Sequence, residues 1–299
     1  MRGRPIDILY AALERSKEAI LKTPLRQIPG IGLVYIRLSN VISNRRYRNV
    51  DVPERITYRG RQIYVDPESD WAKEMYLGNG CPDYIKNDWA ILSDYLSEGD
   101  LVLDIGAFVG THTLMMRELI GESGEVYLFE PQPDCINLLE KTIYANRFDN
   151  CSIIPKLVGQ EDGTQELMTT KSPDSTSNVT DRDPWNRGYD SVSVGMTRLD
   201  SFLHDNHIEE VDFIKVDVQG AELQVIKGLG TRLADVSTIY MEIHSKYIAN
   251  VPEEVSDLFD TLHSKGDIIR VDANTPNVVE NAEEIMFERK HPTIIWVSD

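Results

Sequence analysis

The feature that most constrains this fold is a short apolar strand that runs through a glycine-bearing turn directly into a helix. It is the segment LVLDIGAFVGTHTL, residues 101–114. The strand brings Asp104 to its carboxyl end, and Gly106 and Gly110 let the backbone turn tightly against a ligand. Free N–H groups at the start of the next helix point at the same place, as they do in nucleotide sites. The segment predicts an α/β domain with a ligand site at this edge of its sheet.

Strands and helices alternate regularly beyond this segment, which favours a mostly parallel sheet with helices on both faces. Seven strands are predicted, at 101–105, 125–130, 151–158, 211–218, 236–243, 267–272 and 293–298. Helices are expected near 111–120, 133–146, 221–229 and 252–265. Residues 160–195 interrupt this alternation with two strand-like runs that flank a polar segment. A long irregular insertion inside a compact domain is usually functional or mobile.

The first 82 residues differ in character and are predicted to form a helical and hairpin cap on the domain that follows, residues 83–299. Residues 6–22 have apolar positions at helical spacing, and ITYRGRQIYV predicts a hairpin that turns at Arg59–Gly60. Ten Lys and Arg against three Asp and Glu give residues 1–48 a net charge of +7. The rest of the chain therefore carries −25, for a total of −18.

This charge distribution bears on partners and compartment. An acidic body disfavours nucleic acid as the main substrate, because phosphates would be repelled over most of the surface. The basic front end could dock on an anionic membrane, or it could pack on its own acidic domain. No apolar run reaches the roughly 18 residues of a membrane span, and the three cysteines lack metal-ligand spacing. We therefore expect a cytoplasmic protein, with peripheral membrane contact through residues 1–48 as an option.

The second predicted strand helps to choose between two cofactors. It ends at Glu130, where a carboxylate can accept hydrogen bonds from two ribose hydroxyls. A dinucleotide fingerprint needs glycine at the positions of Gly106, Phe108 and Thr111, and only the first matches. S-adenosylmethionine (SAM) instead suits an acid two residues before the first glycine and another glycine four residues after it. The sequence therefore favours a SAM site over a nicotinamide site.

A second segment contains several candidate functional residues. It is DFIKVDVQGAELQVIKGL at 212–229, and it places charged residues inside a predicted buried strand. Lys215 and Asp217 lie on one face of it by period-two alternation, and Glu222 opens the next helix. Such a set could be an ion network that merely orders the turn, or it could act on a substrate. Glu242 and His244 end the neighbouring predicted strand, so they would converge on Asp217 and could supply a general base.

Five segments together resemble the FkbM family of SAM-dependent methyltransferases. They are DIGAFVG at 104–110, FEPQPDCINLLEKTIYAN at 129–146, MTRLDSFL at 196–203, IKVDVQGAELQVIKGL at 214–229 and MEIH at 241–244. The resemblance covers roughly residues 83–244. It implies a Rossmann-like class I methyltransferase fold whose last strand is antiparallel, and methylation of hydroxyls on sugars, glycolipids or polyketide-type products. Phe108 and Gln219 depart from the family pattern, which commonly has Asn and Glu there.

We therefore expect a SAM-dependent methyltransferase that modifies a hydroxyl on a glycan, a glycolipid or a secondary metabolite. The alternatives are a non-catalytic protein that binds SAM, and a nicotinamide-dependent oxidoreductase. Three side chains are predicted to be catalytic, namely Asp217, His244 and Glu222. The predicted cofactor-binding residues are Asp104, Gly106, Ala107, Gly110, Thr111 and Glu130. Asp217, Glu222 and Glu242 could hold a divalent ion, but the prediction is that no metal is needed.

Overall fold

The computed structural model describes residues 51–78, 83–169, 190–244, 251–271, 277–281 and 292–298, with scattered positions before residue 51. Contacts divide the chain into two units, Met1–Pro53 and Glu54–Asp299. Most of the helix predicted at 6–22, and the centre of the predicted insertion, lie outside the described residues. Among the helices that are described, none combines the length and the apolar character needed to cross a bilayer.

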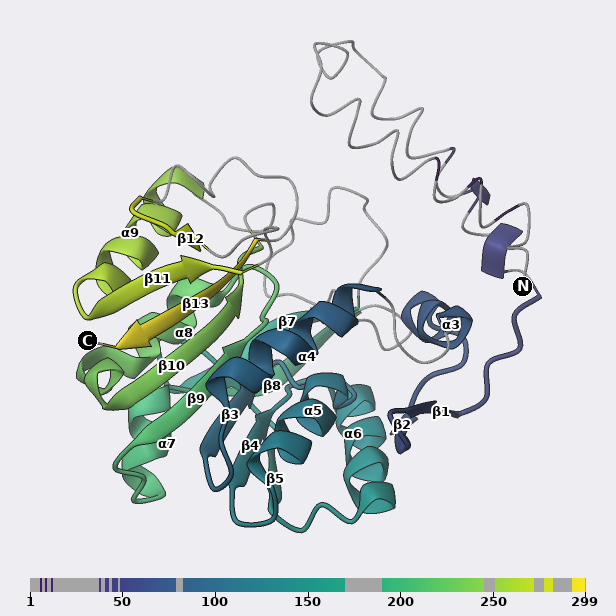
Figure 1. Ribbon diagram of the computed structural model, residues 1–299, viewed down its shortest axis with the longest axis horizontal. Coiled ribbons are helices and arrows are strands. Elements are labelled where there is room, and N and C mark those ends of the chain that lie inside the picture. Colours follow the sequence, from purple (N-terminus) through teal and green to yellow (C-terminus); the bar gives the residue numbers. More distant parts are fainter. Residues whose placement is uncertain are drawn as a thin grey trace. The chain divides into compact units, whose positions relative to one another are not determined.

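The larger unit is built on an eight-stranded sheet of order β12-β11-β13-β10-β9-β3-β4-β5 (Figure 1). The strands are β3 (Leu101–Ile105), β4 (Glu125–Phe129), β5 (Cys151–Ile154), β9 (Val211–Val216), β10 (Val236–Glu242), β11 (Gly266–Arg270), β12 (Asn277–Val278) and β13 (Thr293–Ser298). Neighbours from β10 to β5 run parallel, whereas β13 is antiparallel to both β10 and β11. This topology confirms the predicted Rossmann-like class I methyltransferase fold, including its antiparallel last strand.

Two details of the strand prediction are wrong. The sheet has one strand more than the seven predicted, because the edge of β11 is long enough to pair residues 277–278 as β12. The predicted strand at 151–158 is two strands, because the chain turns after Ile154, where its carbonyl accepts the N–H of Lys156. Leu157–Val158 then forms β6, which leaves the main sheet.

Helices cover both faces of the main sheet (Figure 1). One face carries α4 (Asp83–Tyr95), α5 (Thr111–Ile120) and α6 (Pro133–Asn146). The other carries α7 (Leu199–Asp205), α8 (Glu222–Leu229), the 3-10 turn η2 (Gly230–Asp235) and α9 (Val251–His263). On that second face Leu229, Phe259 and Trp296 belong to one continuous buried cluster with the central strands. Burial of large apolar side chains on both faces explains why the strands read as nearly continuous apolar runs.

The predicted insertion forms a small sheet of its own. Its order is β6-β8-β7, with β7 at Gly163–Thr169 and β8 at Asp190–Thr197. β7 and β8 are antiparallel and correspond to the two strand-like runs in the sequence. β6 pairs with β8 through Leu157 and Val158, so this sheet begins where the chain leaves β5.

The predicted hairpin is present as β1 (Arg55–Tyr58) and β2 (Arg61–Tyr64), and it turns at Arg59–Gly60. Both turn residues have positive φ, 47° and 82°, as a two-residue hairpin loop requires. The hairpin lies in the larger unit, as does the short helix α3 (Asp70–Leu77). Its backbone is bound to α6, because the Gln62 N–H donates to Asn146 Oδ1 (3.0 Å) and Asn146 Nδ2 donates to the Gln62 carbonyl (2.7 Å).

Replacing Asn146 with Ala should loosen this hairpin. The substitution leaves the N–H and carbonyl of Gln62 without their side-chain partner, so the free energy of unfolding should fall by about 1 to 3 kcal/mol. Chemical denaturation measures the loss, and hydrogen exchange should localise it to β1 and β2. Asn87, which is exposed on α4, is the matched control, and its replacement with Ala should change stability by less than about 0.5 kcal/mol.

Candidate active site

The turn after β3 requires two glycines because other parts of the chain pass close to it. Gly106 has φ +81°, and a Cβ there would overlap the backbone oxygen of Asp217. Gly110 has φ +94°, and a Cβ there would lie 2.9 Å from Leu139 Cδ1 on α6. The first contact joins the ends of β3 and β9, where the Asp217 N–H also donates to the Ile105 carbonyl at 3.0 Å, and the second packs the turn against α6.

A buried lysine joins the same strand ends. Lys215 Nζ lies 3.2 Å from Asp104 Oδ1 and 3.7 Å from Asp217 Oδ2, and it donates to the Gly106 carbonyl at 2.7 Å. Asp104 is fully buried, and its other oxygen accepts the Thr113 hydroxyl at 2.6 Å. Burial lowers the pKa of Lys215, but the carboxylates of Asp104 and Asp217 outweigh it, so this pKa lies above its usual value. Lys215 therefore stays charged and holds the turn.

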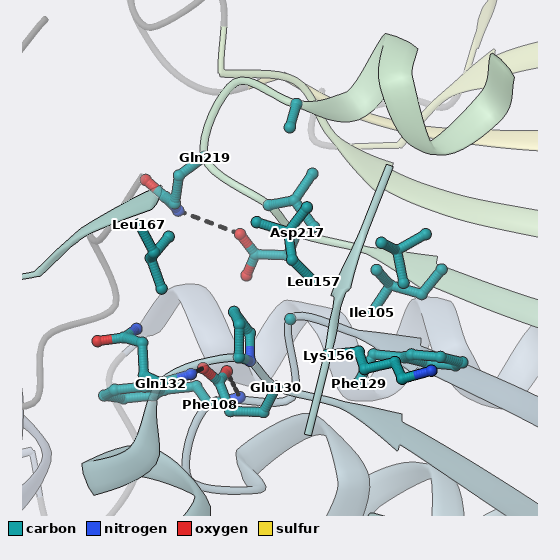
Figure 2. A pocket seen from close by; sticks show the side chains of 15 residues that line it. Ile105, Phe108, Phe129, Glu130, Gln132, Lys156, Leu157, Leu167, Asp217 and Gln219 are labelled. Carbon is teal, nitrogen blue, oxygen red and sulfur yellow. Dashed lines mark hydrogen bonds between the residues drawn. The ribbon is translucent and has the colours of Figure 1, made fainter. Parts of the chain in front are cut away.

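A pocket opens at the carboxyl ends of β3, β4 and β9 (Figure 2). Glu130 and Phe108 lie on one side of it, and Asp217 and Gln219 face them from the other (Figure 2). The small sheet contributes the wall formed by Leu157 and Leu167. The other lining residues are Ile105, Gly106, Phe129, Pro131, Gln132, Lys156, Val158, Val218 and Ala221.

Glu130 is buried in the wall of this pocket and oriented by the backbone. Its two oxygens accept the N–H groups of Phe108 (2.8 Å) and Gln132 (2.9 Å). Burial raises the pKa of Glu130 to about 7, although these two hydrogen bonds act in the opposite direction. A carboxylate held in this way can use its remaining lone pairs on ligand hydroxyls.

The predicted cofactor residues therefore divide into two groups. Gly106 and Glu130 line the pocket, whereas Asp104 in β3, Ala107 and Gly110 in the turn, and Thr111 at the start of α5 are not among its lining residues. Thr111 is buried, and its hydroxyl has no hydrogen-bond partner in the described part of the chain. Sequence reasoning did not identify Phe108, Lys156 or Leu167 as lining residues. Of these three, only Leu167 could have been anticipated, because the alternation of apolar and polar residues in its strand-like run places it on the buried face.

The three predicted catalytic residues come together beside the pocket. His244 Nδ1 lies 2.8 Å from Glu222 Oε1, and both side chains are buried. The amide nitrogen of Gln219 lies 2.9 Å from His244 Nε2 and 3.1 Å from Asp217 Oδ1, so Gln219 bridges these two groups. Burial lowers the pKa of His244, but the hydrogen bond and charge of Glu222 outweigh it and place this pKa above its usual value.

Glu242 completes this group of acids. Its Oε1 lies 3.8 Å from His244 Nε2, and its side chain is 34% exposed against 23% for Asp217. Burial, and then the charge of Asp217, raises the pKa of Glu242 to about 7. Burial also acts to raise the pKa of Asp217, but the Lys215 ammonium and His244 hold it below its usual value. Asp217, Glu242 and His244 bring one ligand atom each within 4.8 Å of one another, a spacing that a divalent ion could accept.

A further polar cluster borders the site from α4. Asp88 accepts the Tyr240 hydroxyl at 3.1 Å and lies 3.0 Å from His112 Nε2. Burial lowers the pKa of His112, but the hydrogen bond to Asp88 outweighs it, so this pKa is raised. The cluster ties α4, α5 and β10 together where they approach the acids.

With this geometry in place, residues 104–269 match the family described as the Methyltransferase FkbM domain. The chain belongs to the FkbM methyltransferase family. The resemblance seen in the sequence is thereby confirmed.

Two curated relatives and one solved structure illustrate the range of similar proteins. Hexuronic acid methyltransferase AglP of Haloferax volcanii is 25% identical over 158 residues, which cover 52% of this chain and 60% of the relative. Methyltransferase sdnD of Sordaria araneosa is 26% identical over 163 residues, covering 45% and 62%. The chain thus spans about three fifths of their lengths. The crystal structure of Methyltransferase FkbM from Methylobacillus flagellatus has a TM-score of 0.43 at 11% identity and covers 86% of this chain and 60% of that one.

Replacing Lys215 with Met should show how strongly the turn depends on one buried charge. The substitution leaves the buried Asp104 carboxyl without its cationic partner, so the free energy of unfolding should fall by about 3 to 5 kcal/mol. Lys227 is the control, because its pair with Asp257 at 3.8 Å is exposed. Lys227→Met should cost less than about 1 kcal/mol in the same denaturation measurement. Equal stability of the two variants would contradict this role of Lys215.

Proposed function

We propose that this protein transfers a methyl group from SAM to a hydroxyl of a glycan, a glycolipid or a secondary metabolite. The observation that carries the proposal is the pocket at the carboxyl ends of the parallel strands, with Glu130 on one side and Asp217 on the other. Ligands of open α/β sheets bind at this edge. Membership of the FkbM family supports the same class of reaction.

The residues present fit the proposed cofactor. Glu130 is placed to accept ribose hydroxyls, and the Phe108 ring offers an apolar surface in the same wall. Outside the pocket lining, the buried hydroxyl of Thr111 at the start of α5 has no hydrogen-bond partner in the described part of the chain. SAM would supply a methyl group on a positively charged sulfonium, which the acids at the end of β9 and β10 would stabilise.

Methyl transfer to a hydroxyl requires that the two reactants are positioned and that one proton is removed. In-line transfer of a methyl group depends mainly on holding the two reactants together, an effect worth at most about 7 to 11 kcal/mol. The acceptor hydroxyl must also lose its proton, and we assign this step to the acid–base group formed by Asp217, His244 and Glu222 together with the neighbouring Glu242. Because Lys215 already neutralises Asp217 and Gln219 occupies His244 Nε2, we propose that the group acts without a metal.

The alternatives have less support. A nicotinamide cofactor needs glycine where its pyrophosphate approaches the backbone, and here the Phe108 side chain lines the pocket instead. A non-catalytic SAM-binding protein would have no use for the His244–Glu222 pair at 2.8 Å beside the pocket. The hexuronic acid methyltransferase among the relatives supports a glycan acceptor.

Calorimetry with SAM tests the cofactor site. Glu130→Gln removes the charge that strengthens hydrogen bonds to the ribose, so SAM binding should weaken by about 1 to 3 kcal/mol. Because the pKa of Glu130 is raised to about 7, wild-type affinity should also fall as the pH drops through 7 and the carboxylate takes up a proton. Glu125→Gln, at the amino end of the same strand, is the control and should bind SAM normally. Tight NADH binding without SAM binding would overturn the proposal.

We further propose that the basic segment 1–48 brings the protein to an anionic membrane surface. Its net charge of +7 contrasts with −25 on the remainder of the chain. Purified protein should pellet with vesicles that contain anionic lipid and should be released as salt rises, because screening weakens the attraction. Removal of residues 1–48 should abolish pelleting. Equal pelleting with neutral vesicles would contradict an electrostatic contact.

A further inference from the structure

The acid–base group contains side chains that differ in their access to an acceptor. His244 is 2% exposed, and its two ring nitrogens face Glu222 and Gln219. Glu222 is fully buried behind it. Asp217 and Glu242 are 23% and 34% exposed. Only these two carboxylates combine proximity to the pocket with open surface, so they are the groups that an acceptor can touch.

The two carboxylates also differ in their electrostatic surroundings. Lys215 lies 3.7 Å from Asp217 and favours its ionised form, whereas Glu242 lies beside Asp217 and is disfavoured as an anion. Two acids whose pKa values are pushed apart in this way commonly divide their roles, one as a fixed anion and one as a proton acceptor. Charged and titratable groups from several neighbouring elements act on Glu242, namely Lys215 of β9, Asp217 after β9, Tyr240 of β10, His244 after β10, His112 of α5 and Asp88 of α4. Glu222 of α8 faces this group through its contact with His244.

We propose that Glu242 is the general base, that Asp217 binds a hydroxyl next to the reacting one, and that the acceptor is therefore a sugar with two adjacent hydroxyls. This inference rests on the proposed function. The acceptor oxygen forms a bond to the methyl carbon, and its proton passes to Glu242. The bond between that carbon and the sulfonium sulfur breaks with its electron pair left on sulfur, which becomes a neutral thioether.

The spacing of the two acids supports a diol rather than a lone hydroxyl. Their nearest ligand oxygens lie within 4.8 Å of each other. Each carboxylate can accept a hydroxyl at about 2.7 Å, so two neighbouring ring hydroxyls can each reach a different carboxylate. Asp217 keeps its charge through Lys215 and makes the stronger, fixed contact. Glu242 is left for the hydroxyl that reacts.

Steady-state kinetics at saturating SAM separate the two roles. The acceptors are methyl glycosides of common hexoses, pentoses and hexuronic acids, with labelled SAM. Glu242→Gln should lower kcat by about 100-fold or more with little change in acceptor KM. Asp217→Asn should raise acceptor KM by about tenfold or more. Glu242→Asp, which keeps the acid on a shorter side chain, should recover part of the lost rate.

The pH profile distinguishes a base from a structural residue. Glu242 accepts a proton only when ionised, and its pKa is about 7, so wild-type kcat should rise with pH through 7 and then level off. Glu242→Gln should remove this rise, whereas Asp217→Asn should keep the rise but move it to lower pH, because the charge of Asp217 raises the pKa of Glu242. A raised carboxyl pKa means that ionised Glu242 destabilises the fold above its unfolded pKa, so the melting temperature of Glu242→Gln at pH 8 should be unchanged or higher. Glu125→Gln should match wild type in rate and profile.

Deoxy sugars test the acceptor class. A glycoside lacking the hydroxyl beside the methylated one should lose at least about tenfold in kcat/KM with wild type and little further with Asp217→Asn. Four results would overturn the inference: normal turnover by Glu242→Gln, loss of the pH limb in Asp217→Asn instead, equal use of the deoxy sugar, or loss of activity in a metal chelator. SAM binding without methylation of any glycoside would overturn the acceptor class alone, whereas absence of SAM binding would overturn the proposed function itself.

Discussion

The structure of the site depends on one buried ammonium. Lys215 contacts Asp104, Asp217 and the carbonyl of Gly106, which belong to two neighbouring strands and the turn between strand and helix. An uncompensated charge in such a place would be costly, and the same contacts fix the backbone against which a cofactor would lie. Lys215 also controls the protonation state of Asp217, because its charge lowers the pKa of that carboxyl group, whereas burial alone would raise it.

The acids in and beside the pocket show how carboxylates at adjoining strand ends can have different properties. Glu130 receives two backbone N–H groups, Asp217 receives an ammonium, and Glu242 has an anion as its neighbour. A few side chains and backbone groups at adjoining strand ends create these three different carboxylate environments. Under the roles proposed above, neighbouring strand ends would supply a carboxylate for the ribose, a fixed anion and a proton acceptor.

Much of this arrangement follows from the sequence, and the rest depends on contacts that the sequence does not encode locally. Four elements match their predicted bounds, namely the strands at 101–105 and 293–298 and the helices at 111–120 and 133–146. Their apolar residues follow a clear strand or helix pattern in the sequence. The partners within the site were less predictable. Glu222 was grouped with Lys215 on its position near Asp217, but the order of β9 and β10 brings it to His244 instead. Gln219 gave no signal, because its bridge depends on a left-handed backbone at φ 56°.

The same left-handed conformation recurs at Phe108, with φ 52°, where an aromatic ring lines the pocket. The indole of Trp71 on α3 meets this ring edge-on, with centroids 5.1 Å apart and an interplanar angle of 90°. Any ligand that shifts Phe108 must change the surroundings of that indole. The protein thus carries an intrinsic fluorophore one ring away from its pocket, and occupancy can be followed through light emission without any attached label.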